Sequence, residues 1–351
     1  MNAPGHAVLV VYRDTGAADA IDEYSRRLVG ALVASGCAAR YVSDGLSSAR
    51  HYRGQAPWIL LQYNPFSYGR GGIAPALVRD AAALRRQNGV KLAVCVHEPW
   101  THVYDWRSAF VNACQRAQLT ALVGLADAVF GVTEALARRL RRNAVHVPVG
   151  SNLTPIALSR DAARERLGIA GEFIVTLFGR DHPSRAIVHA EAAIAALTER
   201  HGAESVRVLN LGDGAPAVLA PAGVIVDRPG RLEPTELSMR LRASDLVLLP
   251  FVDGLSTRRT TLMASLAHGV PVAGVLGAGT DRVLIDHPDA LLLTPGGRPA
   301  EHARAVVEIS ADPVRLRGMG DAGRRLYEEH FDWPVLAGRV TAALRGGAPG
   351  F

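Results

Sequence analysis

The chain alternates short apolar runs with longer segments whose apolar residues recur at a helical period. In the first half, this pattern predicts strands at 7–12, 39–43, 58–62, 91–96, 128–132 and 145–148. Helices are predicted there at 19–35, 73–87, 107–125 and 134–142. The strands are largely continuous apolar runs, which indicates a parallel sheet covered by helices on both faces.

The same alternation is repeated in the second half. Strands are predicted at 173–178, 206–211, 223–226, 246–250, 271–275 and 290–293. Helices are predicted at 160–167, 184–200, 234–242, 260–268 and 301–309. Between the halves, the polar stretch 149–159 contains Gly, Asn and Pro and is typical of a linker. We therefore predict two doubly wound, Rossmann-like α/β domains, at 1–152 and 160–330, which face each other across a cleft.

Length and composition agree with two separately packed domains. The 351 residues are 48% hydrophobic, and no charge-free run approaches the roughly 18 residues of a membrane span. The N-terminus passes almost directly into the strand sequence HAVLVVY, so no signal peptide is predicted. Cys37, Cys95 and Cys114 form no CxxC pair, which argues against a disulfide framework and a zinc site. We expect a soluble, cytoplasmic protein without integral membrane association.

The net charge of +6 permits acidic partners but does not indicate nucleic acid. Many arginines lie in stretches such as 82–88 and 135–143, which fall largely within predicted helices, so solvated helix faces account for them. Because no basic strip is interleaved with aromatic residues, nucleic-acid binding is not expected. An anionic small molecule would need only a few cations at one site.

Residues 254–274, GLSTRRTTLMASLAHGVPVAG, concentrate hydrogen-bond donors just before a predicted buried helix. That helix begins near Thr260 and Thr261, where free N–H groups and the positive end of the helix dipole favour an anion. Arg258 and Arg259 add cations suited to phosphate oxygens. The alternative interpretation is an ordinary capped helix with two solvated arginines.

Two other strand-end loops of the second half carry groups compatible with a nucleotide. Arg180 directly follows the strand at 173–178, and Arg185 opens the next helix, so both guanidinium groups could meet one diphosphate. Gly212 follows the strand at 206–211 and would let the backbone approach a flat ligand closely. Taken singly, each feature also fits a surface turn.

Polar residues also follow the strands of the first half. Gly16 and Asp19 come after the first strand, and Asp19 is either a helix N-cap or a substrate ligand. Tyr63 and Asn64 follow the third strand and are expected at the edge of the cleft.

The fourth strand ends in His97 and Glu98, a polar pair that fits a site better than a core. Adjacent side chains on an extended chain point in opposite directions, so this pair gives little support for a metal site. The chain also lacks HExxH, DxD and GxSxG patterns, which argues against the corresponding metal sites and against a serine hydrolase. Thr133, after the fifth strand, is interpreted as a helix cap only.

Taken together, these motifs resemble the retaining family-4 nucleotide-sugar glycosyltransferases of the GT-B fold. The family's GR…K element is similar to Gly179-Arg180, with Arg185 in the place of the lysine. Its glycine-rich element is similar to 211–216. Its long element around the nucleotide-binding helix is similar to 243–250 followed by 265–272.

The likeness covers nearly the whole chain and is strongest from 173 to 275. The VLVVY start, the VHE after the fourth strand and the closing FDW are also similar to the family. In that fold a final helix, here within 331–351, crosses back to the first domain.

The resemblance implies a nucleoside-diphosphate sugar as donor, no cofactor and no metal ion. It assigns Arg180, Arg185 and His97 to catalysis, with His97 addressing hydroxyl groups of the donor sugar. The residues expected to bind the donor are Gly16, Gly212, Asp253, Ser256, Thr257, Arg258, Arg259, Thr260 and Thr261. Those expected to face a small hydrophilic acceptor are Asp19, Tyr63, Asn64 and Glu98.

The chain departs from the family pattern at two positions. Where the family has two glutamates eight residues apart, this chain has Ser256 and Ala264. Asp253 could replace the first glutamate, but Ala264 cannot hydrogen-bond a ribose. A catalytically silent GT-B protein that binds a nucleotide sugar or a partner enzyme is therefore the alternative.

Two other enzyme classes fit less well. A sugar-nucleotide epimerase would need more acidic and histidine residues, and a nicotinamide dehydrogenase would need GxGxxG after the first strand. The donor sugar and its base, the acceptor and the oligomeric state are left open by the sequence.

Overall fold

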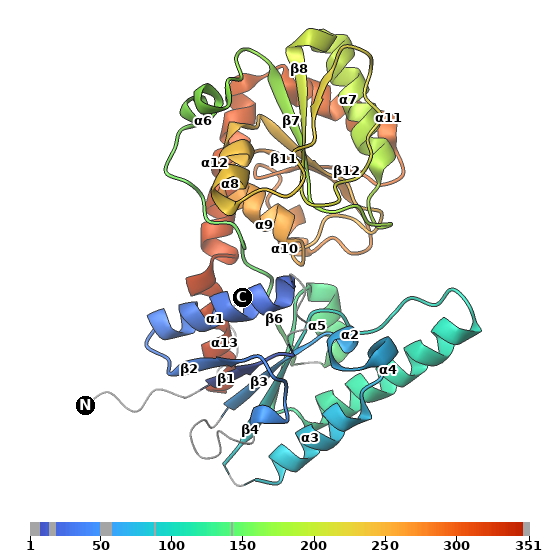
Figure 1. Ribbon diagram of the computed structural model, residues 1–351, viewed down its shortest axis with the longest axis vertical. Coiled ribbons are helices and arrows are strands. Elements are labelled where there is room, and N and C mark those ends of the chain that lie inside the picture. The colour runs from blue at the N-terminus through green and yellow to red at the C-terminus, as the bar shows by residue number, and fades with distance from the viewer. Residues whose placement is uncertain (1–7, 14–18, 50–57, 88, 142, 347–351) are drawn as a thin grey trace. The chain divides into compact units, whose positions relative to one another are not determined.

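The computed structural model describes residues 8–13, 19–49, 58–87, 89–141 and 143–346. The chain divides into two compact units, which Figure 1 shows with the labels used below. Unit 1 comprises Met1–Asn152 together with Trp333–Phe351, and unit 2 comprises Leu153–Asp332.

Unit 1 is built on a parallel sheet. Its strands are β1 Val8–Val11, β2 Ala39–Val42, β3 Trp58–Tyr63, β4 Lys91–Val96, β5 Ala128–Gly131 and β6 Val145–His146. Its helices are α1 Ala20–Ala34, α2 Pro65–Tyr68, the 3-10 turn η2 Arg70–Gly72, α3 Pro75–Arg85, α4 Trp106–Leu125, α5 Glu134–Leu140 and α13 Trp333–Leu344. The strand order is β2-β1-β3-β4-β5-β6, with parallel pairing throughout. The order reverses between β1 and β3, which makes their carboxyl ends the switch point where doubly wound sheets bind ligands.

Unit 2 is built on a second parallel sheet. Its strands are β7 Phe173–Phe178, β8 Val206–Leu211, β9 Ile225–Asp227, β10 Leu246–Leu249, β11 Val272–Leu276 and β12 Leu292–Pro295. Its helices are α6 Arg160–Leu167, α7 Ile187–His201, the 3-10 turn η3 Ala203–Ser205, α8 Pro234–Ala243, α9 Thr260–Ala267, α10 Arg282–Ile285, α11 Pro299–Ser310 and α12 Pro313–His330. The strand order is β12-β11-β10-β7-β8-β9, with parallel pairing throughout. Its switch point lies between β7 and β10.

These two sheets confirm the predicted α/β class and the doubly wound arrangement in each half of the chain. The twelve predicted strands are all present, with small shifts at some ends. Where the helices have described residues, each is too short or too polar to cross a bilayer.

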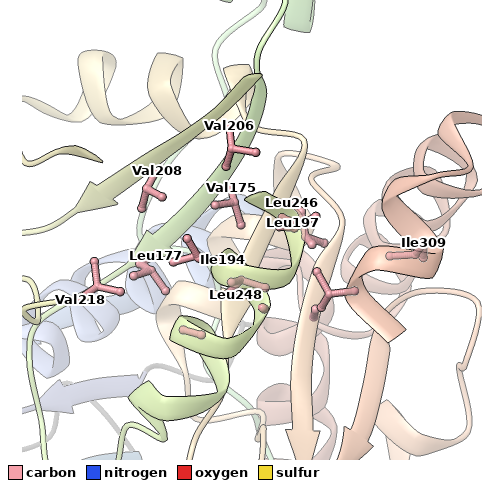
Figure 2. Packing of buried hydrophobic residues seen from close by; sticks show 14 of the residues in the cluster. Val175, Leu177, Ile194, Leu197, Val206, Val208, Val218, Leu246, Leu248 and Ile309 are labelled. Carbon is pink, nitrogen blue, oxygen red and sulfur yellow. The ribbon is translucent and has the colours of Figure 1, made fainter. Parts of the chain in front are cut away.

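A core of unit 2 lies between its sheet and the paired helices α7 and α11. Figure 2 shows Val175 and Leu177 of β7 close to Ile194 and Leu197 of α7, with Ile309 on the neighbouring α11. All five side chains are buried, and each buried aliphatic side chain stabilises the fold by about 1.5–3 kcal/mol. This packing fixes the strands whose carboxyl ends carry the site.

Helix α13 packs into unit 1, where it lies against α1. The indole N–H of Trp333 donates to Ser151 O at 2.8 Å, and its ring lies 5.4 Å from that of Tyr24. A Cβ on Gly150 would lie 2.6 Å from the indole, so glycine at this position makes room for the ring.

Helix α12 is absent from the sequence prediction, and its glycines explain why. Glycine lowers helix propensity, and the segment 313–330 contains three. Two of them allow close packing against α9 and the turn after it. A Cβ on Gly320 would lie 2.4 Å from Gly269 O, and one on Gly323 would lie 2.9 Å from Leu266 Cδ2. Tertiary packing therefore favours glycine here.

Candidate functional site

The loops that follow β7 and β10 are hydrogen-bonded to each other at the switch point of unit 2. The N–H of Ala186 donates to Pro250 O at 3.1 Å, and that of Val252 donates to Ser184 O at 2.7 Å. The start of α7 is thereby held beside the stretch that leads into α9. Two of the three strand-end loops singled out in the sequence are neighbours.

Gly179 lies at the centre of this arrangement. It follows β7 directly, with a φ of +107°. A Cβ at this position would lie 2.6 Å from Arg185 Nη2 and 2.9 Å from Thr261 Cγ2. Arg185 and the first turn of α9 therefore meet at the backbone of the β7 loop.

The guanidinium of Arg185 is oriented by backbone carbonyl groups. Its Nε donates to Arg180 O at 2.9 Å, and its Nη2 donates to Phe178 O. Burial lowers the pKa of Arg185, while the carboxylate of Asp181 opposes that shift. A guanidinium has five N–H donors, so these two bonds orient the group without exhausting it.

A second half-buried arginine lies against the ring that Arg185 contacts. Arg259 Cζ lies 3.9 Å from the centroid of the Phe251 ring, and Arg185 Cζ lies 5.4 Å from it. Asp253 accepts hydrogen bonds from Arg259 at 3.0 Å and from Arg258 at 2.8 Å. Burial, and then repulsion by Arg258, lowers the pKa of Arg259 to about 10. The three guanidinium groups of Arg185, Arg258 and Arg259 outnumber the carboxylates of Asp253 and Asp181, which leaves an excess positive charge suited to phosphate oxygens.

The N-terminus of α9 adds the positive end of a helix dipole to this cluster. Arg259 is its N-cap, and within the described part of the chain no side chain caps the helix. By comparison, Thr133 caps α5, as predicted, and Ser159 caps α6. Thr260 and Thr261 are half-buried. The first N–H groups of α9 therefore suit an anionic ligand.

Ser256 and Thr257 are buried in the loop before α9. Asp281 Oδ2 accepts from both the N–H and the hydroxyl of Thr257, each at 2.7 Å, so Thr257 shapes the loop. The hydroxyl of Ser256 finds no hydrogen-bond partner among the described residues. Ala264, the second position that departs from the family pattern, is fully buried in α9.

Arg180 and Gly212 lie on the side of the site nearest β8. Gly212 has a φ of +131°, and a Cβ there would lie 3.1 Å from the carbonyl carbon of Gly179. The side chain of Arg180 is 75% exposed, with Nη2 3.8 Å from Asp213 Oδ2. The two arginines expected at a diphosphate thus differ, because Arg185 is held by the fold and Arg180 lies on the surface.

In unit 1, His97 follows β4 and is buried. Its Nε2 lies 2.8 Å from Gln62 Oε1, and its ring packs edge-on against Tyr24 at 4.9 Å. Burial lowers the pKa of His97 to about 3. The imidazole is therefore neutral near pH 7 and suits hydrogen bonding rather than proton transfer. Glu98, the next residue, is exposed.

Two residues expected to face the acceptor act as helix caps in unit 1. Asp19 accepts from Ile21 N at 2.8 Å at the start of α1, which fits the capping interpretation. Asn64 accepts from Phe66 N at 3.2 Å at the start of α2. Gly16, expected at the donor, lies outside the described residues.

The structure corrects the position expected for Tyr63. This residue is fully buried rather than at an exposed edge. Strand β3 extends one residue further than predicted and includes Tyr63, whose hydroxyl accepts from Gln118 Nε2 at 3.0 Å. The ring and hydroxyl are therefore part of the interior of unit 1.

Phe251 and Asp281 are important in the unit 2 site but were not predicted from the sequence. An aromatic residue directly after a strand and close to two arginines is a signal that could have identified Phe251. Asp281 lies 24 residues from Thr257, and the sequence gives no local sign of their contact.

A pocket of about 690 Å³ in unit 2 lies at the opposite edge of the sheet. It is lined at the strand starts by residues such as Phe173, Asp245 and Pro271. Arg160 and Arg164, also in its lining, both pair with Asp245. Because doubly wound sheets bind ligands beyond the carboxyl ends of their strands, we place the candidate site at the arginine cluster instead.

The described ranges give little support for a metal-binding site. They contain no group of three or more His, Cys, Asp or Glu placed to hold a metal ion. Among the described residues, Cys37, Cys95 and Cys114 form no disulfide bond. The positive charge at the unit 2 site comes from arginines and a helix terminus.

The chain is similar in sequence to curated glycosyltransferases. It is 28% identical over 258 residues to the D-inositol 3-phosphate glycosyltransferase of Streptomyces bingchenggensis, a match that covers 64% of this chain and 55% of that protein. It is 31% identical over 201 residues to the protein of the same name from Rhodococcus opacus, covering 53% and 44%. The chain thus spans about half the length of the curated relatives it matches. It matches no protein-family model.

Solved structures share the fold over nearly the whole chain. Sucrose-phosphate synthase from Thermosynechococcus elongatus aligns with a TM-score of 0.66 and 17% identity, over 97% of this chain and 98% of that one. HepE from Anabaena, in complex with UDP and glucose, aligns with a TM-score of 0.65 and 13% identity, over 97% and 100%. These likenesses confirm the predicted GT-B fold with its two Rossmann-like halves.

Proposed function

We propose that the chain is a glycosyltransferase that moves a sugar from a nucleoside-diphosphate sugar to a small hydrophilic acceptor. One observation carries the proposal: Arg185, Arg259 and the N-terminus of α9 gather at the carboxyl ends of β7 and β10. That location is the switch point of a Rossmann-like sheet, and the cluster suits a diphosphate. The names of the sequence relatives support the same reaction class.

We further propose that the transfer retains the anomeric configuration. The bond between the anomeric carbon and the diphosphate oxygen breaks, and that oxygen keeps the electron pair. Arg185, Arg259 and the N–H groups of α9 stabilise the developing charge. The acceptor oxygen forms the new bond on the same face, and its proton passes to the departing phosphate. This route needs no pair of catalytic carboxylates, in contrast to glycoside hydrolysis.

The remaining assignments follow the chemistry of each side chain. His97, neutral because of its burial, suits a hydrogen bond to a sugar hydroxyl. Arg180 is exposed enough to contact a phosphate group. A small hydrophilic acceptor is supported by the relatives' name, since D-inositol 3-phosphate is of that kind. Cysteines without disulfide bonds are compatible with the cytoplasmic location that we propose.

The test measures release of nucleoside diphosphate from a panel of nucleotide sugars with candidate acceptors. Arg185→Ala should lower kcat about 100-fold or more, because it removes a group that stabilises the leaving charge. EDTA should leave the rate unchanged, since arginines rather than a metal supply the positive charge. The matched control is Arg324→Ala, which removes an exposed arginine of α12 that pairs with Glu328. An unchanged kcat for Arg185→Ala would contradict the proposed mechanism.

A catalytically silent nucleotide-sugar-binding protein is the second candidate, and Ala264 favours it. A fully buried methyl group stands where the resemblance expects a carboxylate to hold the ribose. Calorimetry separates the two candidates. Donor binding without nucleoside diphosphate release, across the whole acceptor panel, would select the silent protein.

A further inference from the structure

Helix α4 of unit 1 turns polar side chains as well as Leu119 and Leu122 toward the protein, whereas an ordinary surface helix buries a mainly apolar face. Asn112, Gln115 and Gln118 are buried. Gln115 accepts from Thr101 N at 2.7 Å and donates to Gly71 O at 3.0 Å. The polar face of α4 is therefore occupied by contacts within unit 1.

Another face of α4 is apolar and exposed. Trp106, Phe110, Ala113 and Ala117 follow one another at spacings of four, three and four residues, which places them along one stripe of the helix. All four are exposed, Trp106 by 76% and Phe110 by 63%. An apolar stripe in water is unfavourable unless something covers it.

The apolar surface continues into the loop before the helix. Val103 and Tyr104 are 57% and 83% exposed. Figure 1 shows this loop and the start of α4 extending away from the rest of unit 1. We name the exposed set Val103, Tyr104, Trp106, Phe110, Ala113 and Ala117 the α4 stripe.

Positive charge accompanies the α4 stripe. Arg107 Cζ lies 5.2 Å from the ring centroid of Trp106, and Arg116 Cζ lies 4.6 Å from that of Trp100. By sequence, unit 1 has nineteen Lys and Arg against ten Asp and Glu, a formal charge of +9. Unit 2 has twenty against twenty-three, a formal charge of −3. The stripe therefore belongs to the basic part of the chain.

Size and charge argue against a second copy of this chain as the cover. A stable protein interface uses about 20–30 residues on each side, several times the six of the α4 stripe. Two copies would also bring two strongly positive units together. A membrane has neither drawback, because Trp and Tyr settle at the boundary between water and lipid and arginine is attracted to anionic headgroups.

We propose that the α4 stripe docks the protein on a membrane surface that contains anionic lipid. Trp106, Phe110 and Tyr104 enter the boundary between headgroups and acyl chains, while Arg107 and Arg116 contact lipid phosphates. The α4 stripe consists of unit 1 residues only, and membrane docking through it does not depend on whether sugar transfer is the reaction.

The test is cosedimentation of the full chain with phosphatidylcholine vesicles, with and without phosphatidylglycerol. The wild-type chain should bind the anionic vesicles more strongly than the neutral ones. The double variant Trp106→Ser/Phe110→Ser should bind the anionic vesicles at least about tenfold more weakly than the wild type, because two large apolar anchors are lost. Val314→Ser is the matched control, since Val314 is 72% exposed on α12 of unit 2, and it should bind as the wild type does.

The contrary outcomes are specific. The proposal would be overturned if the wild-type chain did not bind vesicles or bound both vesicle types equally. It would also be overturned if the double variant bound anionic vesicles as strongly as the wild type does. If the wild type did not bind vesicles but self-associated, and the double variant did not self-associate, the α4 stripe would be assigned to contact with a second copy instead. Circular dichroism of the double variant checks that it is folded. Its nucleoside diphosphate release, measured in solution, separates a failure of docking from a failure of the proposed function.

Discussion

Gly179 occupies a backbone position that a side chain would disturb in two ways. Its φ of +107° is strained for other residues, and a Cβ would lie 2.6 Å from Arg185 Nη2. Gly179→Ala should therefore displace the guanidinium and weaken nucleoside diphosphate binding about tenfold or more. The strain should cost about 1–3 kcal/mol of stability. Calorimetric titration measures the first effect and urea denaturation the second.

Gly297→Ala separates backbone strain from displacement of the arginine. Gly297 has a φ of +73°, and none of the described atoms lies within 4 Å of a Cβ built there. This control should lose stability but keep its affinity for nucleoside diphosphate. Equal affinities for the two variants would mean that the contact of Gly179 with Arg185 does not matter for binding.

Phe251 is a positioning residue, because its ring supports both Arg185 and Arg259. Each cation–π contact contributes about 0.5–1 kcal/mol. Phe251→Leu keeps an apolar side chain but removes the ring, so the donor KM should rise about 5–30-fold. Phe251→Tyr should restore the wild-type KM. A leucine variant with unchanged KM would show that the ring does not hold the arginines in place.

The cations of the candidate site could be foreseen from the sequence, but the contacts that hold them could not. Arg185 and Thr261 stand at a strand-end loop and a helix start, which are local features. The role of Asp281 depends on its bonds to Thr257, 24 residues away. Tyr63 was expected to follow the third strand at the edge of the cleft, yet it is buried inside unit 1. The burial and contacts of such residues depend on partners that lie far away in the sequence.

At the scale of single elements, the local pattern was sufficient for strands and insufficient for α12. Strands β4 and β7 were predicted residue for residue, because each is a nearly unbroken run of apolar residues. The glycines of α12 argue against a helix when read locally. Gly323 and Gly320 allow close approach to α9 and to the turn after it, and the apolar periodicity of the sequence does not reveal that packing.

Packing of α12 against the turn after α9 leads to a stability prediction. Gly320→Ala should destabilise unit 2 by about 1–3 kcal/mol, the usual cost of overpacking, because its Cβ would lie 2.4 Å from Gly269 O. Gly318→Ala is on the same helix, where the described residues leave more than 4 Å around a Cβ. This control should be stabilised by about 0.5–1 kcal/mol. Urea denaturation curves provide both values, and equal effects would contradict the packing argument.

For the molecule as a whole, we expect two buried histidines to make the stability of unit 2 depend on pH. Burial lowers the pKa of both His268 and His302 to about 4, from 6.5. Between these values the unfolded chain binds protons that the folded chain does not. The free energy of unfolding is therefore highest above pH 6.5, where both histidines are neutral in either state. It decreases as the pH falls toward 4, by about 3 kcal/mol for each histidine.

Urea denaturation between about pH 7 and pH 5.5 measures this effect, since ordinary carboxylates remain largely ionised there. His302→Asn should reduce the pH dependence while keeping a polar partner for Thr294, whose hydroxyl lies 2.8 Å from His302 Nδ1. His182→Asn removes an exposed histidine of the same unit and should leave the dependence unchanged. Stability that stays constant across this range would rule out the proposed contribution.

The division of unit 1 into two chain segments has a consequence for synthesis on the ribosome. Unit 2 runs without interruption from Leu153 to Asp332, whereas α13 of unit 1 is translated only afterwards. A growing chain therefore exposes the face of α1 that α13 will cover until all of unit 2 has emerged. The part of the protein that is made first is the last to be completed. During that interval, nascent-chain chaperones would find their apolar target on α1.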